Sequence, residues 1–537
     1  MKFFNTAGPM VAERHYQVPP LSRLDLEELD RLIDDWRYFV LHAPRQTGKT
    51  TALFTLRDRL NATGRYRCVY VNVEPAQMAR EDVGAGIQTI LGMLSDRCVS
   101  TLGDTSVQEV WPDLLSARGP YAALQATLEQ WASADSKPVV LFIDEIDSLI
   151  GDTLVSVLRQ LRAGYAERPA RFPQSVILCG VRDVRDYRIH ASSEKDPVLG
   201  GSAFNVKAKS LRLGDFCEQE VRELLGQHTQ ETGQPFTEAA MAEVFRLTQG
   251  QPWLVNALAN EACFEKAGVR DRSNQVALDT VVDARERLIL RRDTHLDQLV
   301  HKLEEPRVRH VIEPILSGEP QVQPFRTEDL QYVRDLGLVT QTKPVAIANP
   351  IYQEVIPREL TYPQQEAMHH ETTWYVDDDG ALRMDALLEA FQDYFRANAA
   401  HWDERFQYKE AGPQLLLQCF LQRVVNGGGR IDREYGIGRG RVDLAVVWPL
   451  AKDSEGAEDR APPSREQRVV IECKLMRDGL AAALRTGLPQ TAAYMDEWGA
   501  AEGHLVLFDR TAGRPWSEKL FRRTEEHDGV RITVWGM

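Results

Sequence analysis

The chain has 537 residues, of which 27% are charged, and its formal net charge is −15. Because domains usually hold roughly 100–200 residues, this length excludes a single hydrophobic core, and we expect three or four domains. The net charge excludes a wholly basic nucleic-acid coat but allows a local basic groove.

Other sequence features bear on the compartment. No apolar run approaches the roughly 20 residues that span a bilayer, and the first residues lack a secretory apolar core. The seven cysteines show no metal-ligand spacing. We therefore expect a cytoplasmic protein with reduced thiols, no zinc site and no membrane segment.

The N-terminal part follows a short lead-in (1–30) and alternates apolar strands with helices. We predict strands over 38–43, 67–74, 138–147 and 175–181, helices over 50–60, 120–134 and 151–165, and an amphipathic segment over 81–98. Strands that alternate with helices predict an α/β fold, with a parallel sheet covered on both faces.

The pattern changes to helical periodicity after Gly214, and strands return near the C-terminus. The predicted boundaries are 1–213 for the α/β core, 214–299 for a helical domain, 300–365 for two helices and two short strands, 366–402 for a connector, and 403–537 for a last α/β domain. Two helices followed by two short strands are typical of a winged helix, which binds DNA in some proteins and only connects domains in others.

The first chemical motif is a phosphate loop of the form GxxxxGK[ST], with alanine in place of the first glycine. Its residues are Ala43, Pro44, Arg45, Gln46, Thr47, Gly48, Lys49 and Thr50, and Thr51 follows. Such a loop surrounds phosphates with backbone N–H groups, places a lysine on the terminal phosphates and gives a hydroxyl to Mg²⁺. A chance GKT is the alternative interpretation.

A second motif, VVLFIDEID, favours the phosphate-loop interpretation. Its apolar run places Asp144 at the end of a strand, where the carboxylate can hold Mg²⁺ through water, and Glu145 can orient an attacking water. Nucleotide binding, and hydrolysis with Glu145 as the catalytic carboxylate, are therefore predicted.

Over residues 1–360 the sequence resembles the AAA-like P-loop ATPases, near the archaeal-ATPase and STAND branches. The resemblance rests on APRQTGKTT, LFIDEID, SVILCGVRDVR and GQPWLVNALANEA, and NPIYQEVI is typical of the winged helix. It implies ATP and Mg²⁺ as cofactors, a γ-phosphate sensor near the end of SVILCGV, and a helical lid whose turn Gly250-Gln251-Pro252 contacts nucleotide. Arg182, Arg185 and Arg188 follow the sensor strand; each is a candidate finger for a neighbouring subunit or a solvated surface arginine.

The C-terminal part carries charges inside two apolar strands, RVDLAVVW and VVIECKL. Residues two apart on a strand face the same side, so Glu472 and Lys474 should share one cleft, while Cys473 offers its carbonyl. Asp443 on the adjacent strand completes a carboxylate pair, which can hold Mg²⁺ or Mn²⁺ while the lysine acts on a water.

This D…ExK pattern resembles the PD-(D/E)XK nuclease family. The resemblance implies Glu410 as a further acidic metal ligand, a Gln490/Tyr494 pair on the following helix, and the element order helix, three strands, helix, strand. A structural ion pair and a nuclease fold kept only for binding are the alternatives. Four arginines among glycines (Arg430, Arg433, Arg439 and Arg441) form either a phosphate grip or a solvated hairpin.

Together, these motifs predict an ATP-binding and ATP-hydrolysing protein coupled to a metal-dependent nuclease in defence or in processing of mobile DNA. The expected partners are further copies of the chain and nucleic acid, with DNA as the first candidate and RNA left open. The alternative is an ATP-dependent switch whose C-terminal domain only binds nucleic acid or protein.

Overall fold

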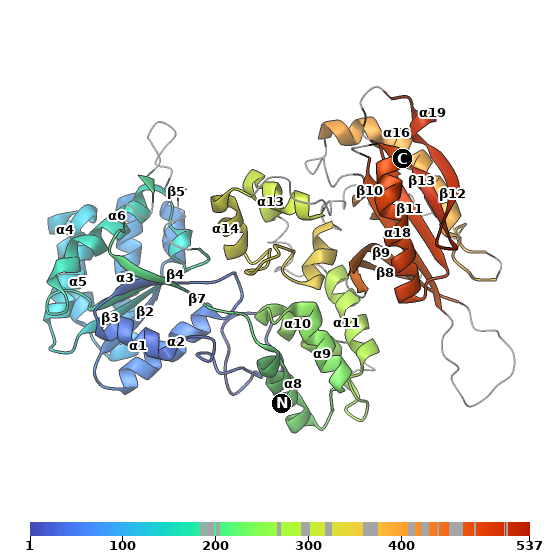
Figure 1. Cartoon of the computed structure of the whole chain (residues 1–537). Coiled ribbons are helices and arrows are strands. Elements are labelled where there is room, and N and C mark those ends of the chain that lie inside the picture. The colour runs from blue at the N-terminus through green and yellow to red at the C-terminus, as the bar shows by residue number, and fades with distance from the viewer. Residues whose placement is uncertain are drawn as a thin grey trace. The chain divides into compact units, whose positions relative to one another are not determined.

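The structure of the chain is a computed structural model. It describes residues 1–182, 188–189, 198–199, 204–265, 270–291, 301–316, 325–357, 374–377, 379–405, 413, 415–418, 420–421, 429–437, 440–450, 466–476, 479–509, 511 and 514–537. These residues form two compact units, one of Met1–Asp297 with Arg326–Ile351 and one of Gln298–Phe325 with Tyr352–Met537 (Figure 1). Among the residues described, no helix has the length and apolarity that a bilayer crossing requires.

The first unit is built on a five-stranded sheet in the order β2-β3-β4-β1-β7. The strands are β1 (Tyr38–His42), β2 (Arg67–Asn72), β3 (Val139–Asp144), β4 (Ser175–Gly180) and β7 (Lys207–Arg212). All neighbouring pairs are parallel, as the alternating pattern predicts. Parallel neighbours bring the carboxyl ends of the strands to one edge, so the residues that follow β1, β3 and β4 converge there.

Helices cover both faces of this sheet, which is why its central strands are apolar throughout. The helices are α1 (Leu26–Asp34), α2 (Lys49–Ala62), α3 (Val83–Leu102), α4 (Ser106–Arg118), α5 (Pro120–Ser133) and α6 (Gly151–Ala163). Side chains of β3 alternate between two cores: Val139, Leu141 and Ile143 pack toward α3, α5 and α6, and Val140 and Phe142 toward α1 and α2.

Among the described residues after β7, this unit continues with the helices α8 (Glu218–Thr232), α9 (Glu238–Thr248), α10 (Pro252–Cys263) and α11 (Leu278–Arg291). The chain returns to the same unit with α14 (Thr327–Asp335) and a single antiparallel bridge between Val339 and Ile347. The span 300–365 is thus divided, because α13 (Pro306–Leu316) belongs to the second unit.

The second unit contains a mixed six-stranded sheet in the order β12-β13-β11-β10-β9-β8. The strands are β8 (Arg430–Ile437), β9 (Gly440–Pro449), β10 (Glu466–Leu475), β11 (Glu502–Phe508), β12 (Phe521–His527) and β13 (Val530–Gly536). β10 is antiparallel to β9 and parallel to β11, so the chain must cross over between β10 and β11.

Helix α18 (Leu480–Trp498) makes this crossover and packs on one face of the sheet. On the other face lie α16 (Met384–Arg405) and helical residues within 413–421. Much of α16 falls in the span predicted as a connector, yet Leu387, Leu388 and Phe391 are fully buried against the sheet. The β12–β13 hairpin was not anticipated from the sequence.

Candidate functional site

The phosphate loop joins β1 to α2 at the carboxyl edge of the first sheet. Gly48, which precedes α2, has φ of +86°, a left-handed conformation that glycine adopts without a steric penalty. Lys49 is buried, and its Nζ donates to the carbonyl oxygens of Ala43 and Pro44, both at 3.0 Å. Thr47 donates to Pro44 O at 2.8 Å, so the loop is closed by its own side chains.

The two sequence motifs meet at Asp144. Thr50 Oγ1 donates to Asp144 Oδ2 at 2.9 Å, and the Tyr70 hydroxyl donates to the same oxygen at 2.8 Å. Asp144 is fully buried at the end of β3, and its Oδ1 accepts the backbone N–H of Glu145. The hydroxyl and carboxylate that the sequence assigned to Mg²⁺ therefore lie in contact, and hard oxygen donors of this kind suit that ion.

Glu145 begins the turn after β3 with φ of +57°, which costs a non-glycine residue free energy. Burial raises the pKa of its carboxyl, and the neighbouring charges of Asp144 and Asp147 add to this effect while Lys49 opposes it. A half-buried carboxyl beside the phosphate loop has the position expected of a residue that orients water.

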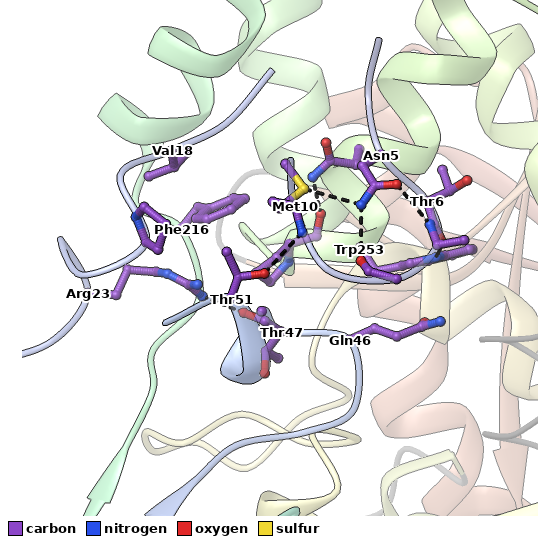
Figure 2. A pocket seen from close by; sticks show the side chains of 16 residues that line it. Asn5, Thr6, Met10, Val18, Arg23, Gln46, Thr47, Thr51, Phe216 and Trp253 are labelled. Atoms are coloured by element: carbon purple, nitrogen blue, oxygen red, sulfur yellow. Dashed lines mark hydrogen bonds between the residues drawn. The ribbon is translucent and has the colours of Figure 1, made fainter. Parts of the chain in front are cut away.

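A pocket opens beside the loop, between the N-terminal segment and the start of α10 (Figure 2). Its lining is Asn5, Thr6, Ala7, Gly8, Met10, Val18, Pro20, Arg23, Gln46, Thr47, Gly48, Thr51, Phe216, Pro252, Trp253 and Asn256. The N-terminal segment is hydrogen-bonded to α2 and to α10. Met10 N donates to Thr51 Oγ1 on α2 at 3.1 Å, and Trp253 Nε1 on α10 donates to Thr6 O at 2.9 Å.

Arg23 is the one charged side chain among the described residues that line this pocket. Its Nη1 donates to the carbonyl oxygens of Thr47 and Gly214 at 2.8 Å, and its guanidinium lies 4.8 Å from the centre of the Phe216 ring. Burial lowers the pKa of Arg23 to about 10, so the group stays charged at neutral pH. Arg23 and residues 5–10 were not identified from the sequence. Arg23 contacts backbone carbonyl groups and residues 5–10 line the pocket by packing, and neither kind of contact requires a sequence motif.

The lid turn packs closely on the segment that carries Phe216. Gly250 has φ of +76°, and a Cβ there would lie 1.9 Å from the carbonyl oxygen of Phe216. Gln251 caps the start of α10, and its side-chain oxygen accepts the N–H of Leu254. Gly250 and Gln251 do not line the pocket, but Pro252 does.

The candidate finger arginines are described only in part. Arg182, which follows β4, lies 5.2 Å from the centre of the Tyr332 ring on α14. Arg185 and the side chain of Arg188 lie outside the described residues. Next to this contact, a Cβ at Gly337 would lie 2.7 Å from Pro44 Cγ, so the chain after α14 touches the phosphate loop.

The second candidate site lies in the other unit, where β9 and β10 run side by side. Val470 and Ala445 face α18, whereas Ile471, Cys473 and Leu444 face α16. Because side chains alternate along a strand, Asp443, Glu472 and Lys474 all lie on the α18 face. The structure therefore brings together the three residues that the D…ExK pattern named.

Their contacts are short. Lys474 Nζ donates to Glu472 Oε1 at 2.6 Å, and Asp443 Oδ2 accepts the backbone N–H of Cys473 at 2.8 Å. Burial, followed by the charge of Asp443, raises the pKa of the fully buried Glu472 to about 8. Burial also raises the pKa of Asp443. Burial acts to lower the pKa of Lys474, but the charge and hydrogen bond of Glu472 together with the charge of Asp443 raise it overall.

This donor set fits a hard divalent cation. Glu472 Oε2 is buried and has no hydrogen-bond partner among the described residues. An unpaired carboxylate oxygen is costly inside a protein unless it serves a ligand. Two carboxylates and the Cys473 carbonyl are the oxygen ligands such an ion prefers.

Further predicted residues of this site are described unevenly. Gln490 Nε2 donates to the Tyr494 hydroxyl at 3.0 Å on α18, so that pair lies together on the face toward the sheet. Glu410, Arg439 and the side chains of Arg433 and Arg441 lie outside the described residues. Arg430 begins β8.

Another polar cluster, Asp385, Glu502 and His504, lies on the α16 face of the same sheet. Trp535 Nε1 donates to His504 Nδ1 at 3.1 Å, and His504 Nε2 lies 2.9 Å from Glu502 Oε1. Both ring nitrogens are engaged, so this cluster fits an anchor for the start of α16 better than a metal site.

Comparisons with known proteins bear on the first unit. Residues 34–187 match the family model described as AAA domain. No curated protein matches the sequence significantly. Similar solved structures include a Walker-type ATPase of Pyrococcus abyssi, at 15% identity and a TM-score of 0.45, covering 66% of this chain and 99% of that one.

Two other similar structures are Cdc6p from Pyrobaculum aerophilum and a RuvB variant from Thermotoga maritima. Cdc6p is 14% identical, with a TM-score of 0.34, and the match covers 66% of this chain and 97% of Cdc6p. The RuvB variant is 13% identical, with a TM-score of 0.33, and the match covers 61% of this chain and 92% of RuvB. These scores are too low to carry an argument, so the assignment rests on the family match and on the loop geometry. Residues 34–187 form an AAA domain of the P-loop ATPase family.

Proposed function

We propose that this protein is an ATP-controlled, metal-dependent nuclease. ATP binds with its base in the pocket between Phe216 and Trp253 and its phosphates in the loop. The observation that carries the nucleotide half is the contact between Thr50 and Asp144, because it assembles the hydroxyl and the carboxylate of two distant motifs at one strand edge.

Each side chain of the nucleotide site has a separate task. Lys49 exchanges the carbonyl oxygens of Ala43 and Pro44 for the terminal phosphates, whose charge attracts its ammonium more strongly. Arg23 faces the phosphates nearest the base, since it contacts the loop at Thr47 and lines the pocket. Glu145 orients the attacking water, and Thr50 and Asp144 hold Mg²⁺.

The nuclease half rests on the buried, unpartnered Glu472 Oε2 beside Asp443 and Lys474. Asp443, Glu472 and the carbonyl of Cys473 would hold Mg²⁺ or Mn²⁺. A divalent ion there would polarise a phosphodiester and make a bound water more acidic. Lys474 positions that water, because its short ion pair with Glu472 fixes the ammonium at the metal-facing carboxylate.

Other features are consistent with this proposal. Along the chain the described elements follow the order expected for the core of the PD-(D/E)XK nuclease family. They are α16 with the helical residues within 413–421, then β8, β9, β10, α18 and β11. Gln490 and Tyr494 are hydrogen-bonded on the helix that covers Glu472. Nucleic acid, with DNA as the first candidate, is accordingly the proposed substrate.

Metal-dependent cleavage of plasmid, single-stranded DNA and RNA, with and without ATP, tests the proposal. Asp443→Asn, Glu472→Gln and Lys474→Ala should each abolish cleavage without lowering ATP hydrolysis, and Lys474→Ala should retain most of the metal affinity. Glu466→Gln is the matched control, since Glu466 lies on the same strand but is exposed and pairs with Arg468 at 3.5 Å.

The outcomes separate the two candidate functions. Cleavage that survives Glu472→Gln and Lys474→Ala would place the active site elsewhere or identify a contaminant. No cleavage by the unaltered protein on any of these substrates, together with intact ATP binding, would favour a nucleotide switch whose C-terminal unit only binds nucleic acid or protein.

A further inference from the structure

The turn that follows β3 carries a third carboxylate, Asp147, besides Asp144 and Glu145. Apolar residues fix this turn on both sides, because Ile146 is fully buried in the sheet's core and Leu149 is 2% exposed. Within the turn, Ser148 N donates to Glu145 O at 2.9 Å. The direction of the Asp147 side chain is therefore set by packing rather than by solvent.

Asp147 reaches the neighbouring strand. Its Oδ2 accepts the backbone N–H of Val181 at 3.3 Å, and Val181 is the first residue after β4. On the other side of β4, Ala43 N donates to Gly180 O at 3.3 Å. A continuous series of contacts thus links the phosphate loop, the end of β4 and the turn that contains Glu145.

Two further side-chain oxygens of the turn have no hydrogen-bond partner among the described residues. Asp147 Oδ1 and Ser148 Oγ are both buried and make no hydrogen bond with any residue in the described part of the chain. A buried acceptor without a donor is costly, so folding alone gives no reason to keep a carboxylate here. An asparagine or an apolar residue would fit this turn at lower cost.

We propose that Asp147 is a positioning residue for ATP hydrolysis, whose carboxylate fixes the end of β4 relative to Glu145. The inference rests on the proposed function, because it assigns a role within the same nucleotide site. In the described part of the chain no hydrogen bond joins Asp147 to Lys49 or Arg23, the residues assigned to the phosphates, so Asp147 acts through the main chain of Val181.

Position matters here because the groups that follow β4 and the water held by Glu145 must both face the terminal phosphate. A misplacement of about 1 Å can cost roughly 100-fold in rate, although the loop still binds the nucleotide. Loss of the anchor should therefore lower kcat and leave ATP affinity almost unchanged, since ATP is bound by the loop and the pocket.

The test compares Asp147→Ala, which removes the acceptor, with Asp147→Asn, which keeps an oxygen at the same place. Asp152→Ala is the matched control, because it removes the same charge from the first turn of α6. Steady-state kinetics give kcat and KM, and hydrogen exchange of the peptide that ends β4 reports on the Val181 amide in nucleotide-free protein.

We expect Asp147→Ala to lower kcat at least about 10-fold, to change KM less than about twofold and to speed exchange of the Val181 amide about 10-fold. Asp147→Asn should restore most of the kcat and most of the protection of the Val181 amide from exchange. Unchanged kcat or unchanged exchange in Asp147→Ala, or an asparagine variant as impaired as the alanine variant, would overturn the anchor. A wild-type protein that binds ATP without hydrolysing it would overturn the proposed hydrolysis as well, which is a distinguishable result.

Discussion

Lys49 donates from Nζ to the carbonyl oxygen of Pro44 at 3.0 Å, so its ammonium lies inside the loop that Lys49 itself terminates. Pro44 O also accepts the Thr47 hydroxyl, at 2.8 Å. A loop held shut by its own donors is ordered before nucleotide arrives. Binding must then exchange these hydrogen bonds for phosphate contacts rather than order the loop afresh.

Replacing Lys49 by alanine should weaken ATP binding by about 10- to 100-fold, because a hydrogen bond to a charged group contributes roughly 1.5–3 kcal/mol. Titration with a fluorescent ATP analogue measures the affinity. Lys137→Ala, which removes an exposed lysine at the opposite end of β3, should bind as the unaltered protein does. Equal affinity in Lys49→Ala would exclude the loop as the phosphate site.

Glu145→Gln should keep ATP binding and abolish hydrolysis, so that ATP stays bound. Glutamine is the informative replacement because it retains both the shape of the side chain and the strained φ of +57°. Single-turnover hydrolysis together with nucleotide retention on a desalting column would reveal the trapped state. Hydrolysis at the unaltered rate would assign the catalytic role to another residue.

Gly250→Ala should destabilise the first unit and weaken nucleotide binding. A Cβ would lie 1.9 Å from the Phe216 carbonyl oxygen at a positive φ, so the segment carrying Phe216 must shift away from the pocket, at a cost of about 2–4 kcal/mol. Gly226→Ala is the control, since nothing lies within 4 Å of a Cβ there and alanine favours helix α8 by about 0.5–1 kcal/mol. Chemical denaturation measures the free energy of unfolding of both variants. Equal stability of Gly250→Ala and Gly226→Ala would contradict the close packing of Gly250 on Phe216.

Metal binding at Asp443 and Glu472 should depend on pH. Burial and the Asp443 charge raise the pKa of Glu472 to about 8, so below that pH a proton competes with the metal for the carboxyl. Mn²⁺ affinity should therefore increase from pH 6 to pH 8, by up to about 10-fold per unit, and level off above pH 8. Calorimetry in buffers of different ionisation enthalpy should detect proton release at pH 7. Affinity that does not vary over this range would contradict the assignment.

The same shift makes a prediction for the metal-free protein. A carboxyl whose pKa rises on folding binds its proton more tightly in the folded state, so its contribution to stability is complete below pH 4.5 and declines as pH rises toward 8. In the presence of EDTA, Glu472→Gln should therefore be more stable than the unaltered protein near pH 9 and gain nothing at pH 4.5. Urea denaturation at the two pH values measures the difference.

Strands buried on both faces were the easiest elements to predict from the sequence. Val139 to Ile143 are apolar at every position because one helical layer covers each side. Charged residues at the end of such a strand then stand out, which is how Asp144 and Glu472 could be identified. The pairing of Asp443 with the Cys473 amide also follows from adjacent strands.

Elements whose residues are not patterned were missed. β12 alternates half-buried and exposed charged residues, so FRRTEEH shows no apolar face, and its pairing with β13 stabilises it instead. The pocket wall formed by Asn5 to Met10 also has no periodicity. Its place is fixed by contacts with Thr51 and Trp253, which are distant in sequence and leave no local signal.

That wall has a practical consequence for expression and for gene design. A shortened protein that begins at α1 would retain every recognisable ATPase motif and yet lose the side of the binding pocket that Asn5, Thr6 and Met10 provide. Weak ATP binding by such a fragment would then reflect the missing pocket wall and not an inactive phosphate loop.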